Sequence, residues 1–250
     1  MRLRAESAIA CRVFIAANFQ GEKLASSDFA IQITGADRVT ARLYPAAKAE
    51  RIHVSLILGH GAGANQLSGF MRLFGAGLAE RGLDVLTFSF LYMEQGRKIP
   101  DPGPRLESCY RAAIDTVVKH KKLKGNRLVI GGKSMGGRIA SQVAASQPDD
   151  IDGLVFLGYP LHPPGRPDKL RSEHLPKIKV PMLFVQGSRD AFGNKQEIEM
   201  IIKELKLSAE LYAIEGGDHS FKVPKSASIT QQQVYTLVLD HIARWIRESV

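Results

Sequence analysis

Residues 127–146 read RLVIGGKSMGGRIASQVAAS and contain the signal that decides the fold. A short apolar run is followed by glycines and then by apolar residues at helical spacing, which predicts a strand, a sharp turn and a helix. The turn matches G-x-S-x-G, a motif in which the serine adopts a strained backbone that exposes its hydroxyl. We expect glycine at 132 and 136 because larger side chains would collide across the turn. We interpret Ser134 as a nucleophile.

The same stretch contains Gly132-Lys133-Ser134, which resembles the end of a phosphate-binding loop, G-x-x-x-x-G-K-[ST]. Such a loop needs a glycine five residues before Gly132, where this chain has Arg127 inside the predicted strand. The phosphate-loop interpretation therefore fails, and Lys133 has no assigned role. A loose dinucleotide motif at 59–64 is also disfavoured, because the next strand ends without the expected acidic residue.

Strands and helices alternate on both sides of this stretch. The predicted strands are 29–34, 39–45, 53–61, 84–90, 127–132, 153–160, 181–187 and 209–216. The predicted helices lie around 70–78, 106–117, 134–146, 194–205 and 231–248. This alternation predicts a mostly parallel, doubly wound α/β sheet, with the first two strands as an antiparallel N-terminal hairpin. Residues 161–180 contain four prolines, which predicts a loop with at most a short helix and no separate cap domain.

Length and composition favour one domain. The chain has 250 residues, 44% of them hydrophobic, and we find neither repeats nor a linker, so we expect an N-terminal extension at 1–27 and a single domain at 28–250. The formal charge of +9 would suit a polyanion, but aromatic residues make up only 7% and no basic run is interleaved with them. The basic run at 119–124 fits a solvated helix end. We therefore expect no nucleic-acid partner.

The two cysteines, Cys11 and Cys109, form no paired motif, which favours a reducing compartment and argues against structural zinc. No window has the apolar length of a membrane span, and the apolar stretch at 8–17 is interrupted by Arg12. We expect a soluble cytoplasmic protein with no membrane partner, no metal and no cofactor.

A serine nucleophile needs a histidine that takes its proton and an acid that orients the histidine. In this type of sheet the chain order is serine, acid, histidine, in loops after strands. His219 lies in a glycine-rich loop directly after the final predicted strand. His162 and His174 precede the candidate acid, and His241 lies on the last helix, where a structural role is the ordinary explanation. We therefore predict His219 as the base.

The predicted acid is Asp190, in a short loop after the strand at 181–187. Asp218 is the competitor, but adjacent side chains on one loop rarely orient each other, and it is adjacent to His219. Asp190 would alternatively cap the following helix, although Asn194 is better placed for that.

Backbone N–H groups must hold the negative oxygen that forms during acyl transfer. We predict that Met135, just after the nucleophile, supplies one of them and that Ala62, in the glycine-rich loop 59–66, supplies the other. The residues predicted to contact substrate are His60, Gly61, Tyr159 and His162. Basic residues at 166, 169 and 171 suggest a preference for acidic substrates, and a solvated loop face remains the alternative.

Four motifs occur in order, HGAG, GKSMGG, GSRD and GDHSF, and over about residues 28–248 the chain resembles the α/β-hydrolase superfamily. The stretches GHGAGA, GGKSMGGR, GYPLHPPGRP and QGSRDAFG are most similar to a small capless branch. That branch is related to dienelactone-hydrolase-like proteins and includes a testis-expressed protein and the hydrolase-like region of a histone-acetyltransferase complex subunit. Dienelactone hydrolases proper have cysteine at the position of Ser134.

The resemblance implies a serine hydrolase that cleaves an ester, thioester or related small acyl substrate through an acyl-enzyme. It implies Ser134 as nucleophile, Asp190 as acid, His219 as base, and Ala62 with Met135 as oxyanion donors. A non-catalytic module that keeps the fold for partner binding remains the alternative.

Overall fold

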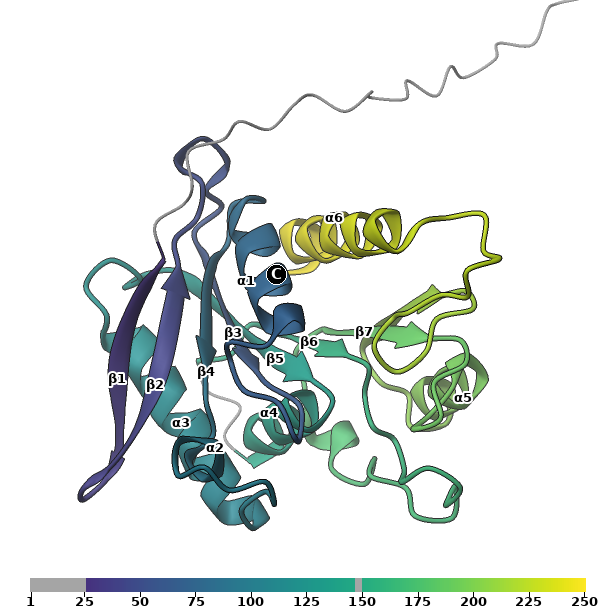
Figure 1. The fold of residues 1–250 in the computed structure, drawn as a ribbon, viewed down its shortest axis with the longest axis horizontal. Coiled ribbons are helices and arrows are strands. Elements are labelled where there is room, and N and C mark those ends of the chain that lie inside the picture. The colour runs from purple at the N-terminus through teal and green to yellow at the C-terminus, as the bar shows by residue number, and fades with distance from the viewer. Residues whose placement is uncertain (1–25, 147–149) are drawn as a thin grey trace, which may run out of the picture.

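A computed structural model describes residues 26–146 and 150–250, and within them eight strands form one sheet (Figure 1). The predicted extension therefore lies almost entirely outside the described residues. The strands are β1 (Ser27–Thr34), β2 (Asp37–Tyr44), β3 (Val54–Gly59), β4 (Asp84–Phe88), β5 (Arg127–Lys133), β6 (Gly153–Leu157), β7 (Met182–Gly187) and β8 (Ala209–Ile214). The helices are η1 (Lys48–Glu50), α1 (Gly69–Ala79), α2 (Leu91–Glu94), α3 (Gly103–Lys119), α4 (Met135–Ser146), η2 (Leu175–Lys177), α5 (Lys195–Glu204) and α6 (Gln231–Ser249).

The sheet has the strand order β1-β2-β4-β3-β5-β6-β7-β8. The hairpin β1–β2 is antiparallel, and β2 also runs antiparallel to β4, whereas every pair among β3 to β8 is parallel. The predicted fold class is confirmed. The chain leaves β3 for β4 on one side and later returns to β5 on the other, so a topological switch point lies between β3 and β5. Ligand sites of such sheets lie beyond the carboxyl ends of the strands at this point.

Helices cover both faces of the sheet, and each face has its own core. On one face, α3, α4 and α5 pack against the sheet, and on the other α1 and α6 lie side by side (Figure 1). Buried strands with apolar side chains on both faces explain why the sequence shows continuous apolar runs rather than alternation.

The structure differs from the expected element bounds mainly where strands end. The predicted strands 53–61 and 153–160 stop at Gly59 and Leu157, because the residues that follow turn over the edge of the sheet, with Gly158 at φ 69°. The short helix α2 was not predicted. The loop 161–180 contains only η2, as expected, and the described residues form no cap domain over the sheet edge. Within the described residues no helix has the length and apolar composition of a membrane span.

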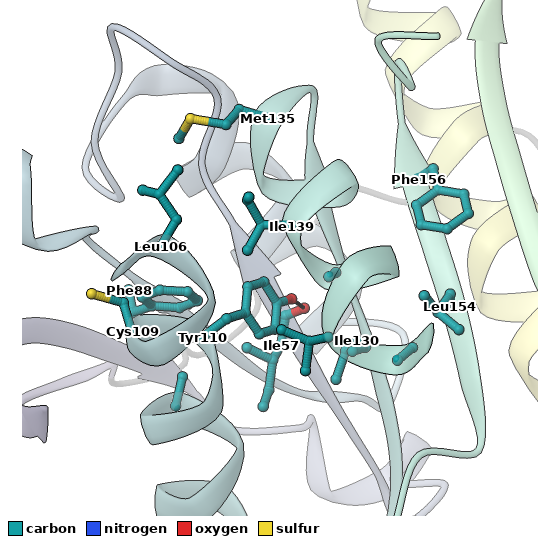
Figure 2. Packing of buried hydrophobic residues seen from close by; sticks show 14 of the residues in the cluster. Ile57, Phe88, Leu106, Cys109, Tyr110, Ile130, Met135, Ile139, Leu154 and Phe156 are labelled. Atoms are coloured by element: carbon teal, nitrogen blue, oxygen red, sulfur yellow. Dashed lines mark hydrogen bonds between the residues drawn. The ribbon is translucent and has the colours of Figure 1, made fainter. Parts of the chain in front are cut away.

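A buried tyrosine ties α3 to the central strands. Tyr110 projects from α3 toward Ile57 and Ile130 of the sheet (Figure 2). Its hydroxyl lies 2.9 Å from the Ile57 carbonyl oxygen and 2.5 Å from the Gly131 carbonyl oxygen, and it accepts a hydrogen bond from the Gly131 N–H at 2.9 Å. One phenol oxygen therefore satisfies backbone groups of both β3 and β5, directly below the predicted nucleophile turn.

Tyr110→Phe is expected to lower the free energy of unfolding by about 2 kcal/mol, because buried backbone groups lose their partner. Urea unfolding at neutral pH measures the change. The matched control is Tyr44→Phe: the Tyr44 hydroxyl is also buried but forms no hydrogen bond of standard geometry with the described residues, so the expected change is below about 0.5 kcal/mol. Equal losses in the two variants would contradict this account of Tyr110.

Candidate active site

Ser134 occupies the turn between β5 and α4 and has φ 51°, in the left-handed region that non-glycine residues rarely adopt. Its N–H donates to the Leu157 carbonyl oxygen on β6 at 3.1 Å. Its own carbonyl oxygen accepts from the Arg138 N–H at 3.1 Å, in the first turn of α4. The surrounding hydrogen bonds thus hold the serine in the strained conformation that the motif predicts.

The glycines around Ser134 pack closely against strand β3. A Cβ atom at Gly132 would lie 2.8 Å from the Gly59 nitrogen, and one at Gly136 would lie 2.9 Å from the Gly59 Cα, with even closer approaches to the Gly59 carbonyl. The nearest obstacle at both positions is strand β3, a contact that the sequence did not predict. The serine turn packs backbone against backbone on β3.

The structure brings the three predicted reactive residues together. The Ser134 hydroxyl lies 2.8 Å from His219 Nε2, and His219 Nδ1 lies 2.7 Å from Asp190 Oδ2. Ser134 follows β5, Asp190 follows β7 and His219 follows β8, all at the carboxyl edge of the sheet. A carboxylate only accepts, so Nδ1 carries the proton and Nε2 is free to accept from the serine hydroxyl.

Asp190 is held by a network that sequence reasoning missed. Its side chain is fully buried; Oδ2 accepts from Gln186 Nε2 at 2.8 Å and Oδ1 from the Phe192 N–H at 2.8 Å. With His219, the carboxylate thus has three donors, which fix its position beside the imidazole. The competitor Asp218 instead accepts from backbone N–H groups of its own loop. Asn194 caps α5, as expected.

The other histidines after Ser134 have structural partners. His241 pairs with Glu210 at 2.8 Å and stacks on Tyr212, as expected for a structural residue. His174 Nε2 lies 2.7 Å from the Ser141 hydroxyl.

A cavity of about 570 Å³ opens over Ser134. Gly61, Ala62, Met135 and His219 line it, so both predicted oxyanion donors border the space in front of the nucleophile. Arg171, one of the basic residues that suggested acidic substrates, also lines the cavity, together with Phe70, Asp101, Arg138 and Phe192, for which no contact with substrate was expected. Within residues 26–146 and 150–250, no group of three or more His, Cys, Asp or Glu side chains is placed to hold a metal ion.

Three of the four residues expected to contact substrate lie outside the described lining of this cavity. His60 is fully buried; its Nδ1–H donates to the Gly61 carbonyl and its Nε2 accepts from the Phe90 N–H, and burial lowers its pKa to about 4. Tyr159 is fully buried, and its hydroxyl donates to the Arg171 carbonyl oxygen at 2.7 Å. These two side chains position the cavity walls rather than face the cavity.

His162 is the third of these residues. Its Nδ1 lies 2.9 Å from the Pro163 carbonyl oxygen and its Nε2 lies 3.1 Å from Glu197 Oε1, so both ring nitrogens are engaged away from the cavity. The exposed fraction of the residue is only 5%. His162 therefore joins the loop 161–180 to α5, and among the four candidates Gly61 borders the cavity.

Lys133, which had no expected role, lies beside the nucleophile and contacts the histidine loop. Its Nζ donates to the His219 carbonyl oxygen at 2.6 Å and lies 5.8 Å from the Phe70 ring centroid. Burial lowers the pKa of its ammonium to about 8, and the nearby carboxylates of Asp190 and Asp218 oppose that shift. Lys133 thus connects the serine turn to the loop that carries His219.

This shift predicts how Lys133→Met changes stability with pH. The unfolded chain binds the Lys133 proton more tightly than the folded protein, so the proton destabilises the fold below about pH 10 and most strongly, by about 3 kcal/mol, below pH 8. Relative to the variant, wild type should gain about 1.4 kcal/mol per pH unit between pH 8 and 10. Urea unfolding from pH 7 to 9.5 tests this, with the exposed Lys119→Met as control; a pH-independent difference for Lys133→Met would contradict it.

Comparison with known proteins agrees with this architecture. The family described as Alpha/beta hydrolase domain matches residues 52–247. Dienelactone hydrolase from Anabaena variabilis is similar over 92% of this chain and 100% of that chain, with 22% identity and a TM-score of 0.72. An α/β serine hydrolase homologue from Coxiella burnetii is similar over 87% of this chain and 96% of that chain, with 18% identity and a TM-score of 0.69. An α/β serine hydrolase without lid from Xanthomonas campestris is similar over 88% of this chain and 94% of that chain, with 19% identity and a TM-score of 0.68. At these identities the likeness to the solved structures shows the fold, and the family match covers most of the chain. The chain belongs to the alpha/beta hydrolase family.

Proposed function

We propose that this protein is a serine hydrolase that cleaves an ester, thioester or related acyl substrate through an acyl-enzyme. The observation that carries the proposal is the hydrogen-bonded series Ser134, His219 and Asp190, with distances of 2.8 and 2.7 Å, at the floor of an open cavity. A serine hydroxyl is weakly nucleophilic at neutral pH, and this series supplies the base that activates it.

In the first half of the reaction, Ser134 Oγ attacks the acyl carbonyl carbon while His219 Nε2 takes the hydroxyl proton. The resulting imidazolium is stabilised by Asp190, to which Nδ1–H already donates. The carbonyl oxygen becomes an oxyanion, and we assign its donors as the N–H groups of Ala62 and Met135, which border the cavity. His219 then gives its proton to the leaving alcohol or thiol, and the acyl group remains on Ser134.

In the second half, water replaces the leaving group. His219 Nε2 takes a proton from the water as its oxygen attacks the acyl-enzyme carbonyl, and the proton returns to Ser134 Oγ when the carboxylic acid is released. No cofactor takes part in this sequence. The strained backbone of Ser134 keeps its oxygen at the cavity during both steps.

A fluorophosphonate probe tests this proposal, since it phosphonylates activated serines. We expect labelling of wild type and none of Ser134→Ala. The matched control is Ser220→Ala, which removes another serine hydroxyl that lines the cavity and should keep the labelling. Absence of labelling in both wild type and the control would contradict the enzyme and favour a non-catalytic module. Hydrolysis of para-nitrophenyl esters of increasing acyl length then defines the neutral acyl chain that the cavity accepts.

Two finer points belong to the same proposal. The motifs GGKSMGGR and GYPLHPPGRP support placement in the small capless branch that includes a testis-expressed protein and a histone-acetyltransferase complex subunit. Cys11 and Cys109, which form no paired cysteine motif, support a cytoplasmic location. Fractionation of cells that express the protein would test this location.

A further inference from the structure

Two arginine side chains, Arg138 of α4 and Arg171 of the loop after β6, line the same cavity as Ser134. They lie close enough for their charges to interact: burial lowers the pKa of Arg138, and the positive charge of Arg171 lowers it further. Two like charges in a partly buried wall cost free energy unless a negative group joins them. The closeness of these two positive guanidinium groups therefore requires an explanation.

Neither arginine forms an ion pair with a carboxylate of the described residues. The side chain of Arg138 has one hydrogen bond, to Gln142 Oε1 at 3.4 Å, and that of Arg171 has one, to the Pro160 carbonyl oxygen at 3.5 Å. Both distances are long for N–H···O bonds, and each guanidinium has five N–H donors. Most of this donor capacity is therefore not taken up by the residues that the structure describes.

Two carboxylates close to this wall, those of Glu107 and Asp101, are already paired with other arginines. Glu107, whose charge acts on Arg138, lies 3.2 Å from Arg111. Asp101, which also lines the cavity, lies 2.6 Å from Arg97. The cavity around Ser134 therefore keeps an excess of positive charge, which attracts an anion and strengthens its binding in a site of low dielectric.

The backbone fixes both arginines relative to the nucleophile. Arg138 lies one helical turn after Ser134, and its N–H donates to the Ser134 carbonyl oxygen at 3.1 Å. The Arg138 side chain lines the same cavity as Ser134. The Arg171 N–H donates to the Leu161 carbonyl at 2.8 Å, and its carbonyl oxygen accepts from the Tyr159 hydroxyl at 2.7 Å. The buried Tyr159 thus positions Arg171.

We propose that Arg138 and Arg171 form an anion subsite and that the substrate is an acyl ester or thioester that also carries a carboxylate. The planar guanidinium fork matches a carboxylate with two parallel hydrogen bonds, which a single ammonium does not provide. The carboxylate lies between the two arginines while the reacting carbonyl lies at Ser134. This inference rests on the proposed hydrolase function and adds the substrate's charge to it.

Two matched esters test the proposal: the mono-para-nitrophenyl ester of adipic acid, and the uncharged ester in which an isopropyl group replaces the free carboxylate. We expect wild type to have a kcat/KM about 10-fold or more higher for the anionic ester. Arg138→Gln and Arg171→Gln should each lower kcat/KM for the anionic ester roughly 10- to 100-fold, mainly through KM, and change the uncharged ester less than about 3-fold. Arg→Lys at either position should restore only part of the loss.

The control variant is Arg166→Gln, in the same loop, whose exposed guanidinium pairs with Asp168. It should leave both esters unchanged. Equal hydrolysis of the two esters by wild type, or equal losses on both in the arginine variants, would overturn the anion subsite while leaving the hydrolase proposal intact.

Failure of the hydrolase proposal has a different signature: neither ester is cleaved and Ser134 is not labelled by the fluorophosphonate. In that case, calorimetric binding of monomethyl adipate to wild type still decides the question of the subsite. Binding that is lost in Arg138→Gln and Arg171→Gln supports the subsite, and absence of binding overturns it.

Discussion

Asp190→Asn is expected to lower kcat for ester hydrolysis roughly 10⁴-fold while the protein stays folded, the size of effect that this substitution has in a Ser-His-Asp site. The reason lies in which atoms face the carboxylate. Oδ1 accepts from the Phe192 N–H, whereas Oδ2 accepts from both Gln186 Nε2 and His219 Nδ1. An asparagine has one oxygen and one NH₂ group for these two places.

Because the Phe192 N–H always donates, the asparagine oxygen takes the Oδ1 place and its NH₂ group takes the Oδ2 place. The NH₂ group then opposes the Gln186 NH₂ group and donates to His219 Nδ1. That donation moves the imidazole proton to Nε2, where it blocks acceptance of the Ser134 proton. The substitution therefore removes the base without removing any side chain.

Steady-state kinetics with a para-nitrophenyl ester measure this effect, and circular dichroism checks the fold. The matched control is Asp218→Asn, in the adjacent position to His219, where one oxygen, Oδ1, accepts both backbone N–H groups. The asparagine oxygen can replace Oδ1, so the expected loss is less than about 10-fold. Similar kcat values for the two variants would contradict the assignment of Asp190.

Gly136→Ala is expected to lower the free energy of unfolding by about 3 kcal/mol or more. Gly136 is the second residue of α4, where helix propensity alone predicts that alanine stabilises by about 1 kcal/mol. The added Cβ would lie 2.9 Å from the Gly59 Cα and closer to the Gly59 carbonyl, and backbone atoms of a central strand have little room to move. The steric clash therefore makes Gly136→Ala destabilising, although helix propensity alone predicts that it stabilises the fold.

The matched control is Gly103→Ala, at the first residue of α3, where a Cβ atom would meet no heavy atom within 4 Å. There the expected change is zero or a small gain. Urea unfolding of both variants tests the contrast, and fluorophosphonate labelling reports whether the serine turn stays intact. A stabilised Gly136→Ala variant would disprove the close packing on Gly59.

Hydrophobic pattern predicted the strands of the described sheet because the central strands β3 to β7 are buried on both faces, whereas the long helices are buried on one face. Chain order and loop placement were enough to predict that Asp190 and His219 lie beside Ser134, because the carboxyl ends of parallel strands all lie at one edge of the sheet. Strand ends were less accurate: in 53–61 and 153–160 apolar and glycine residues continue past the point where the backbone turns.

The cavity walls were not predictable in the same way. Arg138 looks like an ordinary surface residue of a helix in the sequence, and only packing against the loop 161–180 places it beside Arg171. His60 and Tyr159 are polar residues at strand ends, a pattern typical of substrate contact, yet the His60 ring nitrogens and the Tyr159 hydroxyl form hydrogen bonds with neighbouring backbone. These outcomes depend on side-chain directions that no local pattern encodes.

Because the serine turn packs on Gly59, the residues of this turn tolerate few substitutions, whereas the loop 161–180 tolerates more. Gly59 leads directly into the loop that carries Ala62, so Ser134 and that loop are both supported by the end of β3. At this contact glycines leave no side chain between the two backbones. Of the two arginines, Arg138 shares this support through α4, whereas Arg171 belongs to a loop attached through Tyr159 and Leu161. Substitutions and insertions in the loop 161–180 can therefore alter substrate choice while the reaction centre keeps its geometry, which makes that loop the place to redesign specificity.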